Sequence, residues 1–241
     1  MRRMWLASLL VLLQSACSTP SGFLAESQQN ERAVVRSDPA VNSSRTQRSG
    51  RCGDAITPSE GLVLDLAYEH YNDGRARSAL AHLESVKATA PDFRLLQADA
   101  LSATGQVHEA DKVYEALLHS CLSASAYHGL ALNAVKRSDF DDVDRYMGMA
   151  RQLDPVNADI RNDNGYRLML NGNYAQAEHE FHTALEINQQ QSESAHNLIL
   201  LYLLTNRASE AEQIAQQYQV DSNVVQTLNQ YEISGNGLQR R

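Results

Sequence analysis

From about residue 60 onward, small and bulky apolar residues recur at fixed spacings along the chain. The clearest unit begins with a small residue, Gly165, followed by a second small residue at 177, a bulky one at 181 and a small one at 184. Five sets follow this spacing with minor departures: Ala67, Ala79, Leu83 and Val86; Ala98, Ala110, Tyr114 and Leu117; Ala131, Val143, Met147 and Ala150; Gly165, Ala177, Phe181 and Ala184; Ile199, Ala211, Ala215 and Tyr218. Successive sets are offset by 31, 33, 34 and 34 residues. This periodicity predicts five copies of one structural unit.

Each unit is expected to form two helices joined by a short polar turn. The turns are predicted just before Arg75, Val107, Phe140, Tyr174 and Arg207, where Gly, Asn, Asp, Ser, Thr and Gln gather. Small residues at fixed positions allow the two helices to approach closely. The bulky residues between them are then free to pack against the adjoining unit.

This period and pattern resemble the tetratricopeptide repeat, including its small-and-bulky pair at Ala177 and Phe181 and its boundary proline at Pro155. The resemblance covers about residues 60–225. It implies an all-α fold, a right-handed superhelical solenoid of about five repeats, within residues 58–234. We expect an amphipathic helix over 223–233 to cap the open end, and residues 235–241 to form a disordered tail.

The first residues of the chain have the three parts of an export signal. Arg2 and Arg3 are followed by a short apolar stretch and then by small residues before Cys17. The apolar stretch is shorter than the roughly 20 residues that a membrane-spanning helix needs. We therefore predict a signal peptide over residues 1–16.

The segment LQSAC, which ends at Cys17, resembles the lipobox of bacterial lipoproteins, with Gln14 where leucine is usual. The resemblance implies a lipid on Cys17, and Ser18 after it implies sorting to the outer membrane. The alternative is ordinary signal cleavage that leaves Cys17 free or disulfide-bonded. Residues 17–57 are rich in Ser, Gln, Asn, Arg and Pro, which predicts a disordered tether behind the lipid.

Charge and cysteine content bear on the possible ligands and on disulfide formation. The net charge is -8 and becomes -10 once Arg2 and Arg3 leave with the signal, since 19 basic residues then face 29 acidic ones. This argues against nucleic-acid binding, which needs a basic face. Beside Cys17 only Cys52 and Cys121 occur. In an oxidising compartment they form either a disulfide or two reduced thiols.

Tetratricopeptide repeats usually bind a peptide in the groove lined by their first helices. The residues predicted to face this groove are Tyr68, Tyr71, Leu132, Val135, Asn162, Tyr166, Met169, His196, Leu200 and Leu203. The alternative is that half of them lie in the core, because the register can slip by one residue. A carboxylate clamp for chaperone C-termini needs lysine and asparagine at set groove positions. His128 and Leu132 stand at two groove positions of the third repeat, so no such clamp is expected.

The segment HEFH, from His179 to His182, resembles the zinc-protease signature only superficially. Thr183 stands where that motif needs its second histidine. We expect Phe181 to be the packing residue of the fourth repeat, with the two histidines solvated and incidental.

Two further groups of residues give little support for a calcium site or a catalytic pair. Asp139, Asp141, Asp142 and Asp144 are expected to cap and solvate a helix start rather than bind calcium, because the glycine and distal glutamate of a calcium loop are missing. Cys121 and His119 do not share a helix face, which argues against a nucleophile and base pair. We therefore expect a non-enzymatic protein with no catalytic residue, cofactor or metal.

A lipoprotein signal, a polar tether and five repeats together resemble the TadD-like lipoproteins of the tight-adherence (Flp) pilus assembly system. Residues 161–181 are similar to the most recognisable repeat of that family. The resemblance implies an outer-membrane, periplasm-facing assembly factor whose partners are a secretin or other pilus components. The alternatives are a type IV pilus pilotin for a secretin, or an adaptor that recruits a periplasmic protease or cell-wall hydrolase. The oligomeric state stays open.

Overall fold

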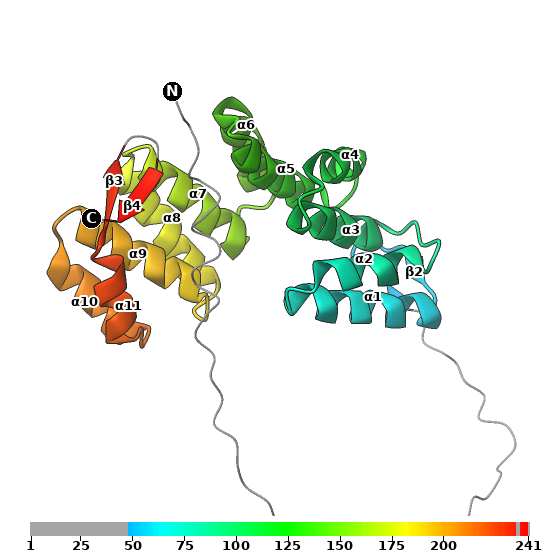
Figure 1. Cartoon of the computed structure of the whole chain (residues 1–241), viewed down its shortest axis with the longest axis horizontal. Helices are drawn as coiled ribbons and strands as arrows, with labels where there is room; N and C mark the ends of the chain where they lie inside the picture. Colours follow the sequence, from blue (N-terminus) through cyan, green and yellow to red (C-terminus); the bar gives the residue numbers. More distant parts are fainter. Residues whose placement is uncertain (1–47, 235–236, 241) are drawn as a thin grey trace, which may run out of the picture. The chain divides into compact units, whose positions relative to one another are not determined.

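The structure is a computed structural model that describes residues 48–234 and 237–240. Within these residues, eleven helices and four short strands occur. Ten helices form five consecutive pairs, numbered here as repeats one to five (Figure 1): α1 (Pro58–Asn72) with α2 (Ala76–Glu84), α3 (Pro91–Ala103) with α4 (Val107–Leu117), α5 (Ser123–Arg137) with α6 (Phe140–Leu153), α7 (Ala158–Leu170) with α8 (Tyr174–Ile187), and α9 (Ser192–Leu204) with α10 (Ala208–Gln217). The predicted helical repeat solenoid is confirmed.

The predicted spacing of small and bulky residues accounts for the packing of the pairs. Of the twenty residues in the five sets, all but Val86 and Tyr218 are buried. A Cβ atom on Gly165 of α7 would lie 2.7 Å from Cε1 of Phe181 in α8. Because real Cβ atoms do not approach other carbons so closely, this helix pair depends on glycine at position 165.

The turn between the two helices is built in the same way in every repeat. Each turn contains one residue with a left-handed backbone: Gly74, Gly105, Ser138, Gly172 and Asn206. The residue after it donates its backbone N–H to the carbonyl five residues earlier, as Arg207 does to Tyr202 at 2.7 Å. This is a Schellman arrangement, which satisfies carbonyls at the end of the first helix and reverses the chain.

The segment just before the first helix is ordered, which corrects the predicted tether over 17–57. Strand β1 (Arg48–Ser49) pairs with β2 (Ala55–Ile56), and the Ile56 side chain is buried in the core of repeat one. A disulfide joins Cys52 to Cys121, which precedes α5. Burial of an apolar side chain and a covalent link to repeat three explain why this polar segment folds. The remaining part of the predicted tether, the signal peptide 1–16 and the lipidation at Cys17 lie outside the described residues.

The C-terminal end also differs from the prediction of a capping helix over 223–233 and a disordered tail. Helix α11 (Ser222–Leu228) packs against α9 but ends at Leu228. It is followed by β3 (Tyr231–Ser234), which pairs with β4 (Gly237–Arg240). The helical interpretation fails because Tyr231 and Ile233 are two positions apart, a spacing that places both side chains on one face of a strand.

Replacing a glycine at a close helix contact is expected to destabilise the protein. A Cβ atom on Gly129 of α5 would lie 2.3 Å from Cζ of Tyr114, which is buried on α4. Overpacking typically costs about 1–3 kcal/mol, which outweighs the roughly 1 kcal/mol that alanine gains over glycine within a helix. Gly129→Ala should therefore lower the free energy of unfolding, measured by urea titration with circular dichroism.

The matched control is Gly148→Ala in α6, where no heavy atom lies within 4 Å of the added Cβ apart from the adjacent residues and the backbone of the same helix. This substitution should leave the stability unchanged or raise it by up to about 1 kcal/mol. Equal effects of the two substitutions would show that the contact with Tyr114 does not limit residue size at position 129.

Removing the disulfide is expected to loosen the first two repeats. The two cysteines are 69 residues apart, and a cross-link over a loop of this length stabilises by about 4 kcal/mol in the chain-entropy view. In a Cys17→Ser background, Cys52→Ser with Cys121→Ser should lower the urea midpoint and increase amide hydrogen exchange over residues 48–117. The protein that keeps both cysteines should show the same lower urea midpoint and faster exchange after treatment with a reductant. Unchanged exchange in both samples would argue against this role of the disulfide.

Candidate functional site

The ten residues predicted to line a partner groove differ widely in exposure. Leu132 is 39% exposed. Six others are half-buried: Tyr68, Tyr71, Val135, Tyr166, His196 and Leu203. The last three are buried, with exposures of 7% for Asn162, 0% for Met169 and 3% for Leu200. The groove prediction therefore needs correction at these three positions.

Met169 and Leu200 belong to the hydrophobic core of repeats four and five. Their predicted role as partner contacts is wrong because a buried side chain is not accessible to a partner. Helix α9 contacts α7, α8, α10, α11 and β3. It is therefore covered on more sides than the first helix of a repeat in the middle of the solenoid. The apolar run from Leu198 to Leu204 matches this enclosed position.

Asn162 is buried for a different reason, since it links two neighbouring first helices. Its Oδ1 atom accepts hydrogen bonds from Ser194 Oγ at 3.0 Å and from Asn197 Nδ2 at 2.9 Å, both on α9. A buried amide with several partners stabilises one fixed helix arrangement. Asn162 is therefore a structural residue, although sequence alone predicted a contact with a partner.

Similar polar contacts join the first helices of the other repeats. His128 Nε2 on α5 lies 2.7 Å from Asp163 Oδ2 on α7. Ser102 on α3 donates to Asn133 on α5 at 2.6 Å, and Lys136 Nζ donates to the Ser102 carbonyl at 2.9 Å. Burial lowers the pKa of the Lys136 amine. We refer to these contacts, together with those of Asn162, as the polar ladder.

The tyrosines near Asp99 are held in their neutral form. Tyr114 donates its hydroxyl to Asp99 Oδ1 at 2.7 Å. Burial raises the pKa of Tyr114, and the carboxylate of Asp99 raises it further. Burial, with a smaller contribution from Asp99, raises the pKa of Tyr71 to about 12. Neither phenol is ionised at neutral pH, so this cluster offers no activated nucleophile.

The chain's own flanking segments contact both ends of the predicted groove. At repeat one, Arg51 donates to Tyr68 at 3.3 Å and to Asp92 Oδ1 at 2.6 Å. At repeats four and five, Tyr166 packs against the same core cluster as Tyr231 of β3. Between these ends lie Leu132 and Val135 on α5, which we call the central groove surface. Leu132 is the most exposed of the ten predicted groove residues.

The HEFH segment lies in α8 and is structural. Phe181 is fully buried, as predicted from the repeat pattern. Glu180 is 4% exposed and accepts from Arg151 at 2.6 Å and from Arg161 at 2.9 Å. Because two arginines hold this carboxylate, it cannot serve as the base of a zinc site. His179 is exposed.

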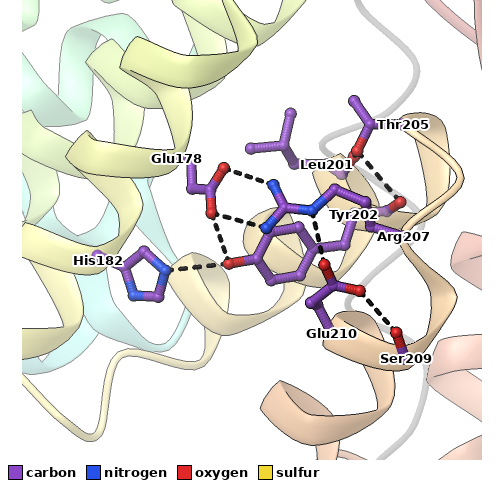
Figure 2. Close-up of polar contacts among 8 residues, drawn as sticks. All are labelled: Glu178, His182, Leu201, Tyr202, Thr205, Arg207, Ser209 and Glu210. Carbon is purple, nitrogen blue, oxygen red and sulfur yellow. Dashed lines mark hydrogen bonds and ion pairs between the residues drawn. The ribbon is translucent and has the colours of Figure 1, made fainter.

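His182 has a defined partner, which corrects the prediction that it is solvated and incidental. Figure 2 shows its Nε2 atom pointing at the Tyr202 hydroxyl, at 3.1 Å. Tyr202 donates to Glu178 Oε1 at 2.9 Å, and Arg207 donates to Glu178 Oε2 at 2.7 Å. The Arg207 guanidinium also lies 4.3 Å from the centroid of the Tyr202 ring. The network joins α8 of repeat four to both helices of repeat five.

Electrostatics fix the direction of these hydrogen bonds. The hydrogen bond from Arg207 lowers the pKa of Glu178, whereas burial, followed by the contact with Glu178, raises the pKa of Tyr202 to about 12. The tyrosine therefore gives its single proton to the ionised Glu178. Its oxygen then accepts from His182, whose Nε2 must carry a proton. These roles describe a structural clamp between repeats.

The remaining candidate chemistry has structural explanations. Cys121 is in the disulfide and carries no thiol for catalysis. Asp139 caps α6 by accepting from the Asp142 backbone N–H at 3.3 Å, and Asp144 pairs with Arg167 of α7 at 2.5 Å. No group of three His, Cys, Asp or Glu side chains suited to a metal is found across 48–234 and 237–240. In the same stretch no helix has the length and apolar character to cross a membrane.

Comparison with known proteins supports the repeat interpretation. No family model matches the chain. The chain is 31% identical over 171 residues to TPR repeat-containing protein PA4299 of Pseudomonas aeruginosa, covering 71% of this chain and 69% of the relative. Such helical repeat surfaces typically act as scaffolds for other proteins.

Solved structures of MamA are similar in fold. The MamA AMB-1 structure is 21% identical, with a TM-score of 0.45, covering 66% of this chain and 89% of that chain. The structure of MamA from Desulfovibrio magneticus RS-1 is 13% identical, with a TM-score of 0.48, covering 68% and 96%. The assignment rests on the sequence relative and on the five helix pairs. The chain belongs to the tetratricopeptide repeat-containing proteins.

Proposed function

We propose that this protein is a lipid-anchored scaffold on the periplasmic side of the outer membrane. In this proposal it binds a secretin or another component of a tight-adherence (Flp) pilus machine and supports assembly of that machine. The protein contributes a binding surface and no chemistry of its own. The lipid at Cys17 confines this surface to the membrane where its partners assemble, which raises their effective concentration.

The observation that carries the scaffold function is the exposure of Leu132 on α5. An accessible aliphatic side chain on a rigid helical surface offers apolar area that a protein partner can remove from water. The polar ladder on both sides of α5 holds its neighbours in place, so a partner binds to a surface that is already formed. A preformed surface reduces the entropy lost on association.

The location and the pilus assignment rest on sequence. The lipobox-like residues before Cys17 support the anchor, and Ser18 supports retention at the outer membrane. The similarity of residues 161–181 to TadD-like lipoproteins supports the pilus system. A type IV pilus pilotin and an adaptor for a protease or wall hydrolase share the anchor and the repeats. Identification of the partner distinguishes these three roles.

The anchor is tested by Cys17→Ser in the full-length chain. Without an acylated cysteine the protein loses its lipid, and we expect it to move from the membrane fraction to the periplasmic fraction after export. Cys52→Ser in a chain that keeps Cys17 is the matched control and should remain with the membrane. Retention of the Cys17→Ser protein in the membrane fraction would refute the lipid anchor.

The partner is tested by chemical crosslinking in envelope membranes, followed by affinity purification and mass spectrometry. We expect a secretin or a Flp-type pilus component with the unaltered lipoprotein, and a loss of at least tenfold with Leu132→Glu. The control is Tyr174→Glu, which alters a side chain of similar exposure (37%) at the start of α8. A type IV pilus secretin, or a protease or hydrolase, would overturn the tight-adherence assignment.

A further inference from the structure

The chain's own C-terminal hairpin lies on repeats four and five. Strand β3 contacts α9, and Figure 1 shows the red strands beside this helix. Three hairpin side chains, Tyr231, Ile233 and Leu238, pack against the core cluster of these two repeats. Tyr166 and Leu203, two residues predicted to contact a partner, pack against the same cluster. The hairpin therefore packs on the same core cluster as two of the residues that sequence assigns to a ligand site.

The apolar side chains of the hairpin share one face. Tyr231 and Ile233 are two positions apart on β3, so their side chains point to the same side. Leu238 on β4 is directly opposite Ile233 in the antiparallel register, and cross-strand partners also share a face. Gln239, next to Leu238 along the strand, is exposed. The hairpin thus presents an alternating apolar pattern to the helices.

The hairpin is also the kind of element that opens easily. Each strand has four residues, and a single two-stranded hairpin is marginally stable by itself. Tyr231, Ile233 and Leu238 all remain half-buried rather than buried. Arg240 hydrogen-bonds to Gln230 at 2.8 Å, a contact within the C-terminal segment itself. Segments with few buried contacts open locally without unfolding the rest of a protein.

We propose that the face of repeats four and five around Tyr166 and Leu203 is a binding site for an extended strand with apolar side chains at alternating positions, and that the C-terminal hairpin occupies this site until a partner strand displaces it. The site rests on the proposed scaffold function but not on the pilus assignment. The partner is defined by its chemistry: a segment with an aromatic and an aliphatic side chain two residues apart.

Burial at Tyr166 agrees with an occupied site. Burial raises the pKa of the Tyr166 hydroxyl, and the neighbouring Tyr231 phenol raises it further. Both tyrosines, 65 residues apart in sequence, also pack against the same core cluster. A tethered segment competes with a free ligand at an effective concentration in the millimolar range. A free strand therefore binds the unaltered chain weakly, because only the fraction of molecules with an open hairpin accepts it.

The test measures binding of a fluorescent peptide with the sequence of residues 229–240 to the full chain. In the chain with Tyr231→Ala and Ile233→Ala, the hairpin loses its main contacts and leaves the site open. We expect this double variant to bind the peptide at least tenfold more tightly than the unaltered chain in fluorescence anisotropy. The control Gln239→Ala changes an exposed hairpin residue and should bind as weakly as the unaltered chain.

A third substitution locates the site. Adding Tyr166→Ala to the double variant should abolish the gain, whereas adding Tyr174→Ala, at the start of α8, should leave it intact. Circular dichroism melts check that each variant is folded. If a tyrosine-to-alanine variant is not folded, leucine replaces alanine at that tyrosine. Equal binding by the double variant and the unaltered chain would overturn the proposal, as would a gain that is insensitive to Tyr166. Either result leaves capture of a partner through Leu132 untouched.

Discussion

The close approach of the two helices within each repeat is the constraint on which the rest of the structure depends. In repeat four the first helix has glycine where the second presents Phe181, and a larger residue at 165 would collide with that ring. The equivalent pairs in the other repeats are also buried. Once the spacing within a pair is set, the left-handed turn residue fixes where the chain reverses. Stacking then follows from contacts between neighbouring pairs.

Polar contacts between repeats restrict this stacking to one arrangement. Apolar cores tolerate small shifts, whereas buried hydrogen bonds and ion pairs lose much of their free energy when partners move. Glu180 binds arginines from α6 and α7, and Glu178 joins Tyr202 and Arg207 in repeat five. The two carboxylates therefore join the fourth repeat to its neighbours on both sides. A rigid array of this kind is well suited to present a surface to another protein.

The sequence predicted the repeats well because the requirement at each packing position is local and recurs five times. It predicted individual site residues less well. Met169 and Leu200 have side chains typical of a groove, but the helices and strands packed around α9 bury Leu200, and these contacts are not encoded in the repeat pattern. The hairpin was missed because its four-residue strands are too short for a clear period, although the spacing of Tyr231 and Ile233 was a signal. His182 finds Tyr202 only through packing of two repeats.

The most direct test of the account asks which face of the solenoid contacts a protein partner in the cell envelope. A photoreactive p-benzoylphenylalanine at position 132 on α5, or at position 174 at the start of α8 as the control, is placed in the full lipoprotein and irradiated in intact cells. The account predicts a crosslinked protein partner from position 132 and none from position 174. Crosslinking from position 174 alone would contradict it, because the central groove surface would then not be where the partner binds.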